Sequence, residues 1–356
     1  MKRLMLVFAR AVLVCIVVAL AACGSQGGAA DNEAVNRKEE AGDTKVKAAF
    51  YVNGTLGDKG FFDSAQRGMQ RAKEELAIEV KTVEGGPNQA DWSAGLESLA
   101  AGGQYDVIVA GTIDMSDIVT DIATRYPEQR FIYFDKEIKD VPNVYSMQYS
   151  QSEGSFLAGA FAALATQSAE LEGANADKVI GFIGGMDIPI INDFRSGYEQ
   201  GARYVDPEVQ VIASYVGDFY NAPKGNEIAL AQFQTQQADI IYVAAGGAGL
   251  GALEASKAAG KYAIGVDSNQ NPLYPGNVLT SMLKNVDVSV FRALDLFRLG
   301  EVPFGTSEVL GIQEGGIGLA KDVLYESYVP QSIRTRMTEI EEKLSNGEIR
   351  VESILQ

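Results

Sequence analysis

The chain has 356 residues, of which 47 are acidic and 30 basic, with a formal net charge of −17. This balance opposes binding to a nucleic-acid backbone or docking on anionic lipid through a basic patch. Histidine is absent and there are two cysteines, which excludes His-based triads and argues against zinc sites and cysteine nucleophiles. We expect no metal, no cofactor and no enzymatic activity, although Asp, Glu, Lys and Tyr alone can support catalysis.

Residues 1–22 have the composition of a secretory signal, because three basic residues accompany an apolar run that ends in small residues. The sequence Leu-Ala-Ala-Cys-Gly-Ser at 20–25 resembles the bacterial lipobox, in which the cysteine is lipidated. A plain signal peptide with an incidental cysteine is the alternative. We therefore expect residues 1–22 to be a lipoprotein signal peptide and Cys23 to carry the acyl groups, palmitate among them, that anchor the protein to the outer face of the cell membrane. Since Cys15 lies in the signal, no disulfide within the mature chain is expected.

Residues 23–45 are rich in Gly, Ala, Asn, Glu and Lys and contain few apolar side chains. Such a segment cannot bury a core, so it is predicted to be a flexible tether. An acyl anchor followed by a spacer suits a globular body that is held near a membrane and free to reorient.

The body of about 310 residues that follows is long for a single core and predicts two lobes. Short β-rich runs alternate with longer helical patterns throughout it. This alternation predicts parallel sheets with helices on both faces, an α/β fold. The predicted strands are 46–52, 78–83, 106–110, 131–134, 144–147, 179–183, 209–215, 240–244, 263–266 and 278–282. The helical patterns include 65–76, 93–101, 117–126, 151–165, 194–204, 224–236 and an acidic C-terminal helix at 337–343.

The stretch 57–65, Gly-Asp-Lys-Gly-Phe-Phe-Asp-Ser-Ala, connects the first strand to the first helix. Strand-to-helix turns at the carboxyl ends of parallel strands form the ligand crevice of such sheets. Asp58, Phe61, Phe62 and Asp63 are therefore candidate ligand-binding residues. The alternative is that Asp63 or Ser64 caps the helix and both rings belong to the core.

The second half opens in the same way, with a strand, a Gly-bearing turn and a helix that begins at Phe194. If two similar halves face each other, Phe61 and Phe194 lie on opposite walls of one cleft. Two rings can then stack on a flat ligand. The alternative is that Phe194 only anchors its helix.

A further turn, Ala-Ala-Gly-Gly-Ala-Gly-Leu-Gly at 244–251, follows a strand and opens a helix, and Asp267 lies at the end of the next strand. Glycines followed by a carboxylate resemble a dinucleotide fingerprint, although the spacing is loose. The same turn suits any small ligand that backbone amides approach. Lys284, after another strand, could bind the same ligand or balance Asp267.

Together these pieces resemble the basic membrane protein family of bacterial lipoproteins, whose best-understood members are purine-nucleoside-binding components of ABC importers. The resemblance covers about residues 46–319. The matching segments are 57–61, 63–65, 154–165, 181–185 with Phe194, 197–199, 201–205, 244–249, 265–270 and 280–284.

The resemblance implies a type I periplasmic-binding-protein fold with two Rossmann-like lobes, three crossovers and a ligand cleft between the lobes. We expect residues 46–150 plus about 270–310 in the N-terminal lobe, and 151–269 plus about 311–356 in the C-terminal lobe. The resemblance also implies that Phe61 and Phe194 stack on the base, and that Asp267 and Lys284 hold the ribose hydroxyls near the backbone of Gly246.

One departure concerns base recognition. Many relatives have Asn after the loop Phe, and here that position is Phe62, which lacks the paired donor and acceptor of an amide. Since base choice depends on such hydrogen bonds, purine selectivity is left open. Asp114 is a candidate for a compensating carboxylate at the base edge. Asp135, at a strand end, is a further candidate cleft carboxylate.

The predicted function is that of a lipid-anchored, monomeric solute-binding protein that captures a nucleoside, most simply a purine nucleoside, by hinge closure and delivers it to an ABC permease. Three alternatives stay open. The first is a binding protein for a different solute, such as a sugar or modified nucleoside, and the second is a dinucleotide-dependent oxidoreductase. The third is a signalling receptor or adhesin of the same fold.

Overall fold

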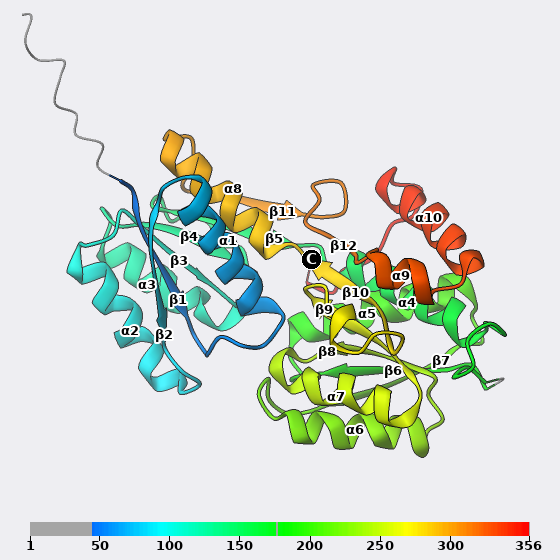
Figure 1. Ribbon diagram of the computed structural model, residues 1–356. Coiled ribbons are helices and arrows are strands. Elements are labelled where there is room, and N and C mark those ends of the chain that lie inside the picture. The colour runs from blue at the N-terminus through cyan, green and yellow to red at the C-terminus, as the bar shows by residue number, and fades with distance from the viewer. Residues whose placement is uncertain (1–44, 176, 356) are drawn as a thin grey trace, which may run out of the picture. The chain divides into compact units, whose positions relative to one another are not determined.

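The computed structural model describes residues 45–175 and 177–355. The predicted signal peptide, the predicted lipidation site Cys23 and nearly all of the predicted tether lie outside the described residues. The described part forms two six-stranded sheets flanked by helices (Figure 1). In this part no helix is long and apolar enough to cross a membrane.

The first sheet is parallel throughout, and its strands are ordered β11-β5-β4-β3-β1-β2. Its strands are β1 (Lys47–Val52), β2 (Glu79–Glu84), β3 (Val107–Gly111), β4 (Arg130–Phe134), β5 (Val144–Tyr149) and β11 (Ser307–Leu310). The helices of this lobe are α1 (Phe61–Glu75), α2 (Gln89–Gly102), α3 (Ser116–Arg125) and α8 (Val286–Leu299).

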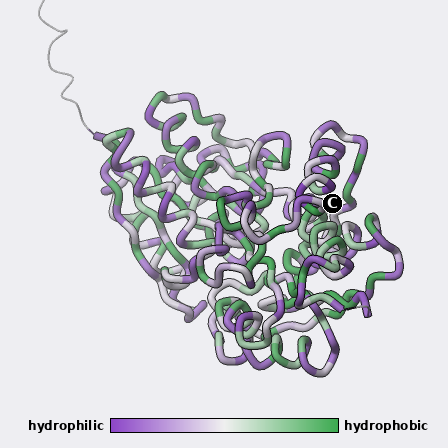
Figure 2. Tube along the Cα trace, turned by 45° about the vertical axis from the view of Figure 1, so that its right-hand side comes forward, coloured by the Kyte–Doolittle hydropathy of each residue, from purple (hydrophilic) through white to green (hydrophobic). Residues whose placement is uncertain are grey.

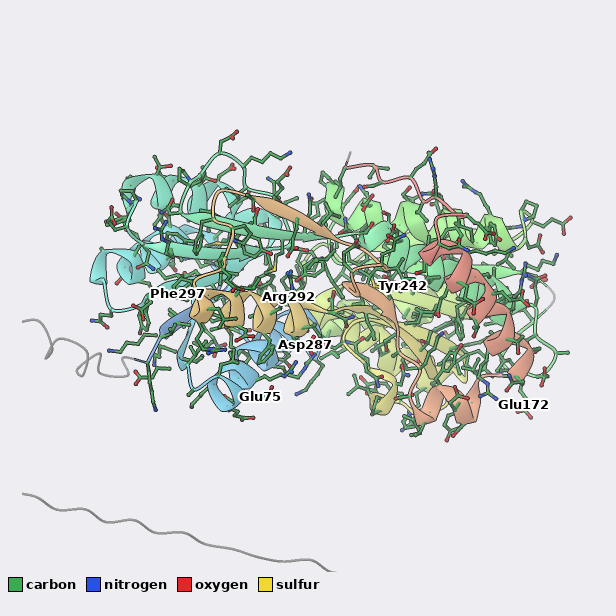
Figure 3. All side chains as sticks on the ribbon, turned by 90° about the horizontal axis from the view of Figure 1, so that it is seen from above. Glu75, Glu172, Tyr242, Asp287, Arg292 and Phe297 are labelled. Atoms are coloured by element: carbon green, nitrogen blue, oxygen red, sulfur yellow. The ribbon has the colours of Figure 1, made fainter. Side chains whose placement is uncertain are left out.

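Alternate side chains of β1 enter different cores, because successive strand residues face opposite sides of a sheet. Ala48 and Phe50 pack with α1 and α8, whereas Ala49 and Tyr51 pack with α2 and α3. The first pair of helices is also joined by an ion pair, Arg67–Asp287, at 3.6 Å. Figure 3 shows Asp287 on α8, followed along the same helix by Arg292 and Phe297.

The second sheet has the order β12-β10-β9-β8-β6-β7, and only the pair β10–β12 is antiparallel. Its strands are β6 (Val179–Gly184), β7 (Gln210–Tyr215), β8 (Ile240–Ala244), β9 (Tyr262–Asp267), β10 (Val278–Lys284) and β12 (Ile317–Leu319). Its helices are α4 (Gln151–Thr166), α5 (Pro189–Val205), α6 (Ala222–Gln234), α7 (Gly246–Ala259), α9 (Val323–Tyr328) and α10 (Gln331–Ser345). Along the outer helices hydrophilic and hydrophobic residues alternate, as expected where one face is buried (Figure 2).

Helices α4 and α5 pack backbone against backbone at glycines. A Cβ atom at Gly159 would lie 1.9 Å from the carbonyl oxygen of Tyr198, and one at Gly201 would lie 1.9 Å from that of Phe156. No larger residue fits such a contact without moving a helix. The Gly-rich and Ala-rich sequence of α4 therefore serves close helix packing.

The predicted α/β fold with two parallel-sheet lobes is confirmed, and all ten predicted strands occur as β1–β10 within about two residues at each end. The short strands β11 and β12 were not predicted. The chain passes between the sheets in three places, after β5, after β10 and between β11 and β12. One lobe boundary differs from the prediction. Residues 278–284 form β10, which pairs with β9 and β12, so this part of the segment 270–310 belongs to the second lobe.

Candidate functional site

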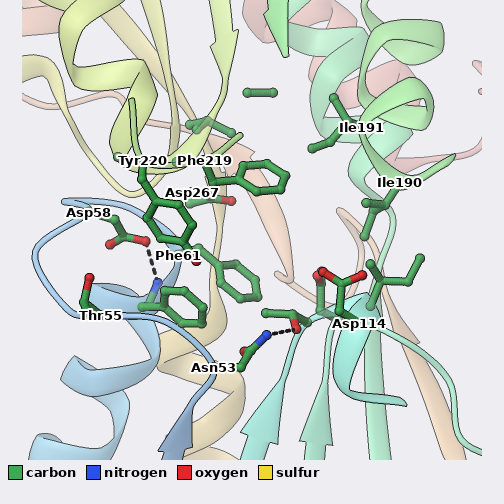
Figure 4. Close-up of a pocket in the computed structure, with 18 of the residues that line it drawn as sticks. Asn53, Thr55, Asp58, Phe61, Asp114, Ile190, Ile191, Phe219, Tyr220 and Asp267 are labelled. Carbon is green, nitrogen blue, oxygen red and sulfur yellow. Dashed lines mark hydrogen bonds between the residues drawn. The ribbon is translucent and has the colours of Figure 1, made fainter. Parts of the chain in front are cut away.

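A cavity of about 470 Å³ lies between the lobes, at the ends of strands from both sheets. Its volume falls within the range of small-molecule sites. The wall includes the predicted residues Asp58, Phe61, Phe62, Asp114, Asp135, Phe194, Gly246, Asp267 and Lys284. Figure 4 shows Asp58 and Phe61 beside the first-lobe loop and Asp267 deeper in the cavity. Nine of the ten predicted binding residues are thus brought together around one space.

The loop before α1 is held by two carboxylates. Asp58 accepts hydrogen bonds from the backbone N–H groups of Gly60 (3.0 Å), Phe62 (2.9 Å) and Asp63 (3.1 Å), and so caps the first turn of the helix. Asp63 accepts from the N–H groups of Gly57 (2.7 Å) and Lys59 (3.0 Å). Among the described residues that line the cavity, Asp63 does not occur. Asp63 therefore holds the backbone of the preceding loop, and the helix cap that the sequence suggested for it is supplied by Asp58 instead.

The two predicted stacking rings lie close to the same amine. The Nζ atom of Lys284 is 5.3 Å from the ring centroid of Phe61 and 5.3 Å from that of Phe194. Phe61 comes from the first lobe and is supported by Phe62 and Phe134, each with a centroid distance of 5.4 Å. Phe194 comes from α5 of the second lobe and is 4% exposed. The rings can therefore flank one ligand from two lobes.

The polar end of the cavity contains one buried amine among carboxylates. Lys284 is 2% exposed and forms an ion pair and a hydrogen bond with Asp135. Burial raises the pKa of Asp135, and the attraction of Lys284 opposes that rise. Burial also raises the pKa of Asp267 to about 7, against the attraction of Lys284 and with smaller repulsion from Asp58 and Asp135. Ionised, this group is poised to accept hydrogen bonds from hydroxyl groups.

Three of these turns contain residues with a backbone conformation that is unusual outside glycine. Thr112, Asp135 and Asp267 have φ values of 78°, 83° and 64° where β3, β4 and β9 end. Each such residue costs about 1–3 kcal/mol and persists only where its surroundings hold it. Strain gathered at the rim of one cavity is typical of a binding site.

The Gly-rich turn after β8 lies in the cavity wall through Gly246 and Gly247. Gly246 has a φ of 54°, and a Cβ atom there would lie 3.4 Å from the carbonyl oxygen of Phe219. The turn therefore brings the backbone at the start of α7 close to the cavity.

Several wall residues were not predicted from the sequence. They are Phe219 and Tyr220 after β7, Ile188, Ile190 and Ile191 at the start of α5, and Asn53, Thr55, Trp92, Thr112 and Leu250. Phe219 and Tyr220 lie in a strand-to-helix turn, so the rule applied to the other turns could have found them. The isoleucines carry no such signal, because their apolar side chains are indistinguishable in sequence from core.

Tyr220 reaches from the second lobe towards the first. A Cβ atom at Gly54 would lie 3.2 Å from the hydroxyl oxygen of Tyr220 and 2.9 Å from the ring of Phe62. The loop before α1 meets the second lobe as well, since Ser268 donates to the carbonyl of Gly60 at 3.0 Å. Residues of both lobes therefore enclose the cavity.

Comparison with known proteins agrees with this architecture. The model of the Bmp family, described as ABC transporter substrate-binding protein PnrA-like, matches residues 45–351. Basic membrane protein A1 of Borrelia garinii subsp. bavariensis is 31% identical over 315 residues, which cover 86% of this chain and 88% of that protein. The CD4+ T-cell-stimulating antigen of Listeria innocua is 28% identical and covers 99% of both chains.

Among solved structures, an ABC transporter solute-binding protein from Aeropyrum pernix superposes with a TM-score of 0.79 at 26% identity, covering 88% of this chain and 94% of that one. Family and neighbours are solute-binding proteins rather than enzymes, which favours a binding role for the Gly-rich turn over a dinucleotide-dependent reaction. From the extent of the family match and the identity to its members, this chain belongs to the PnrA-like family of ABC transporter substrate-binding proteins.

Proposed function

We propose that this protein is a receptor for a purine nucleoside, tethered through lipidated Cys23 outside the cytoplasm, that delivers its ligand to an ABC permease. The observation that carries the proposal is the placement of Phe61 and Phe194, from different lobes, at equal distance from the buried amine of Lys284. A flat base fits between two rings, where stacking adds to the burial of apolar area. A flat ring system with a polar sugar attached therefore suits both the space between the two Phe rings and the polar end near Lys284.

The polar end supplies partners for a diol. Asp267 is 8% exposed, yet no side chain or backbone group in residues 45–175 and 177–355 donates a hydrogen bond to its carboxylate. Lys284 has three N–H donors, and its one hydrogen-bond acceptor in the described structure is Asp135. Ribose hydroxyls would accept from the amine and donate to the carboxylates, which offsets the cost of burying these charges.

We further propose that the ligand is captured by hinge closure. The stacking rings and the polar groups come from two lobes joined by three connections, and contacts such as Tyr220 with Gly54 and Ser268 with Gly60 cross between the lobes. A ligand that touches both lobes stabilises the closed arrangement by its extra contacts there. The body acts as a monomer in this scheme, and no step breaks a covalent bond.

The chain carries its own reporter for the test, because its single tryptophan, Trp92, lines the cavity. Protein that has been unfolded and refolded to remove bound ligand is titrated with guanosine, inosine, adenosine, free bases and ribose, by tryptophan fluorescence and calorimetry. We expect binding of nucleosides but not of ribose alone. Phe61→Ala and Phe194→Ala should each weaken binding at least tenfold, while Tyr328→Ala, a half-exposed ring outside the cavity wall, should leave it unchanged.

Binding of no nucleoside up to millimolar concentrations would refute the proposal. The same titration, extended to other sugars, base-substituted nucleosides and a reduced nicotinamide dinucleotide, separates the alternatives. Binding of sugars only, or of nucleosides with apolar substituents on the base, would indicate that Phe62 marks a changed specificity. Binding of a reduced nicotinamide dinucleotide would favour the oxidoreductase reading of the Gly-rich turn.

A further inference from the structure

Asp114 is a carboxylate in the cavity wall that the nucleoside site above does not use. It lies in the 3₁₀ turn Ile113–Met115, directly after β3. Within the described structure no hydrogen bond or ion pair engages its side chain. Figure 4 shows its carboxylate directed into the cavity, on the side of Ile190.

The turn that bears Asp114 is held in place from two sides. Thr112 has a φ of 78°, and its side chain accepts a hydrogen bond from the Asn53 amide at 2.8 Å. The hydroxyl of Tyr133 donates to the carbonyl oxygen of the same threonine. A strained turn that is fixed in this way presents the following carboxylate in one direction.

Asp114 lies beside Ile190, across the cavity from Asp58 and Asp267 (Figure 4). Burial raises the pKa of Asp114 and the positive charge of Lys136 opposes that rise, while the charge of Asp114 contributes to the raised pKa of Asp135, the partner of Lys284. Lys136 itself donates to the Ser116 hydroxyl at 2.9 Å. If the ribose occupies the end near Lys284, the carboxylate of Asp114 is left for the base.

An ionised carboxylate only accepts hydrogen bonds, and its two oxygens match two neighbouring donors. The edge of guanine presents N1–H beside the 2-amino group, hypoxanthine presents N1–H alone, and adenine presents an acceptor at N1 beside its 6-amino group. We propose that Asp114 reads the base edge and ranks the ligands guanosine, inosine and adenosine in order of falling affinity. This inference rests on the proposed nucleoside site and names its specificity residue.

The test compares dissociation constants of the three nucleosides for the wild-type protein, Asp114→Asn and a control, Asp117→Asn, by Trp92 fluorescence and calorimetry. Asp117 is an exposed carboxylate on α3, outside the cavity wall, so the control makes the same change of charge. A matched pair of base contacts contributes about tenfold or more in affinity. We expect wild type and Asp117→Asn to prefer guanosine over adenosine by at least about tenfold, and Asp114→Asn to lose most of this preference, because an amide can also donate to N1 of adenine.

A measurement on the unmodified protein tests the same contact, which guards against a variant that fails to fold. 1-Methylguanosine lacks the N1–H donor, so it should bind at least about tenfold more weakly than guanosine to wild type. Equal affinity for the three nucleosides, or a preference unchanged in Asp114→Asn, would overturn the inference while leaving the nucleoside site intact. Absence of binding by every nucleoside would instead overturn both proposals.

Discussion

Replacement of Asp267 by Asn should stabilise the ligand-free protein and weaken its function. In the folded protein this carboxylate is 8% exposed, and burial raises its pKa from an ordinary value of 3.8 to about 7. Ionisation of Asp267 at neutral pH therefore costs free energy in the folded state, whereas in the unfolded chain the carboxylate ionises at its ordinary pKa. Asn has nearly the same shape without the charge, and it tolerates the φ of 64° at this position.

The size and sign of the effect follow from linkage. Each pH unit between the two pKa values corresponds to about 1.4 kcal/mol, so the interval from 3.8 to about 7 gives up to about 4 kcal/mol. In that interval the folded state binds more protons than the unfolded state. The contribution of Asp267 to stability therefore falls as pH rises from about 4 to about 7, and the full cost persists above that value.

Urea unfolding of ligand-free wild type and Asp267→Asn at pH 4 and pH 8 measures this difference. We expect the two proteins to be about equally stable at pH 4 and the variant to be more stable at pH 8, by up to about 4 kcal/mol. Asp117→Asn, a change at an exposed carboxylate, should show no such pH-dependent gain. A free-energy difference between variant and wild type that is the same at both pH values would refute the reasoning. Nucleoside binding by Asp267→Asn should be weakened chiefly at pH 8, where the wild-type carboxylate is ionised and accepts hydrogen bonds from the ribose hydroxyls.

Two other substitutions test the packing around the site and between the helices that support it. Lys284→Met removes the cation that pairs with buried Asp135, so it should lower the free energy of unfolding by about 3–5 kcal/mol at pH 7. The loss should be smaller at pH 5, because protonation there removes the negative charge of the carboxylates left without a partner. Urea unfolding at both pH values measures the difference. Gly159→Ala places a Cβ atom 1.9 Å from the carbonyl oxygen of Tyr198, so it should lower stability by at least about 1–3 kcal/mol in a thermal melt. Gly318→Ala is its matched control, because nothing lies within 4 Å of the added atom; equal melting temperatures would contradict the packing argument.

Sequence patterns were sufficient for those features that depend on short stretches of chain. Strand-helix alternation set the two-lobed α/β fold, because hydrophobic periodicity reports local structure. The turn rule assigned Phe61 to the carboxyl edge of the first sheet, and the assumption that two similar halves face each other placed Phe194 across the same cavity. The resemblance to a family supplied what periodicity could not, including the grouping of Asp267 with Lys284 at one site.

Other features arise only when distant segments pack. Strand β10 joins the second sheet because it pairs with β9 and β12. The sequence pattern of residues 278–284 does not indicate which strands it pairs with. Asp58 and Asp63 are chemically alike in the sequence, and the fold alone directs the first into the cavity wall and the second into the loop backbone. The raised pKa of Asp267 comes from burial, with repulsion from Asp58 and Asp135, which lie far from it in the chain. The sequence by itself thus determined which helices and strands form and which turns bear polar or aromatic side chains. The tertiary structure decided which of those side chains lie together and how far their pKa values are shifted, because burial and charge interactions depend on residues far apart in the chain.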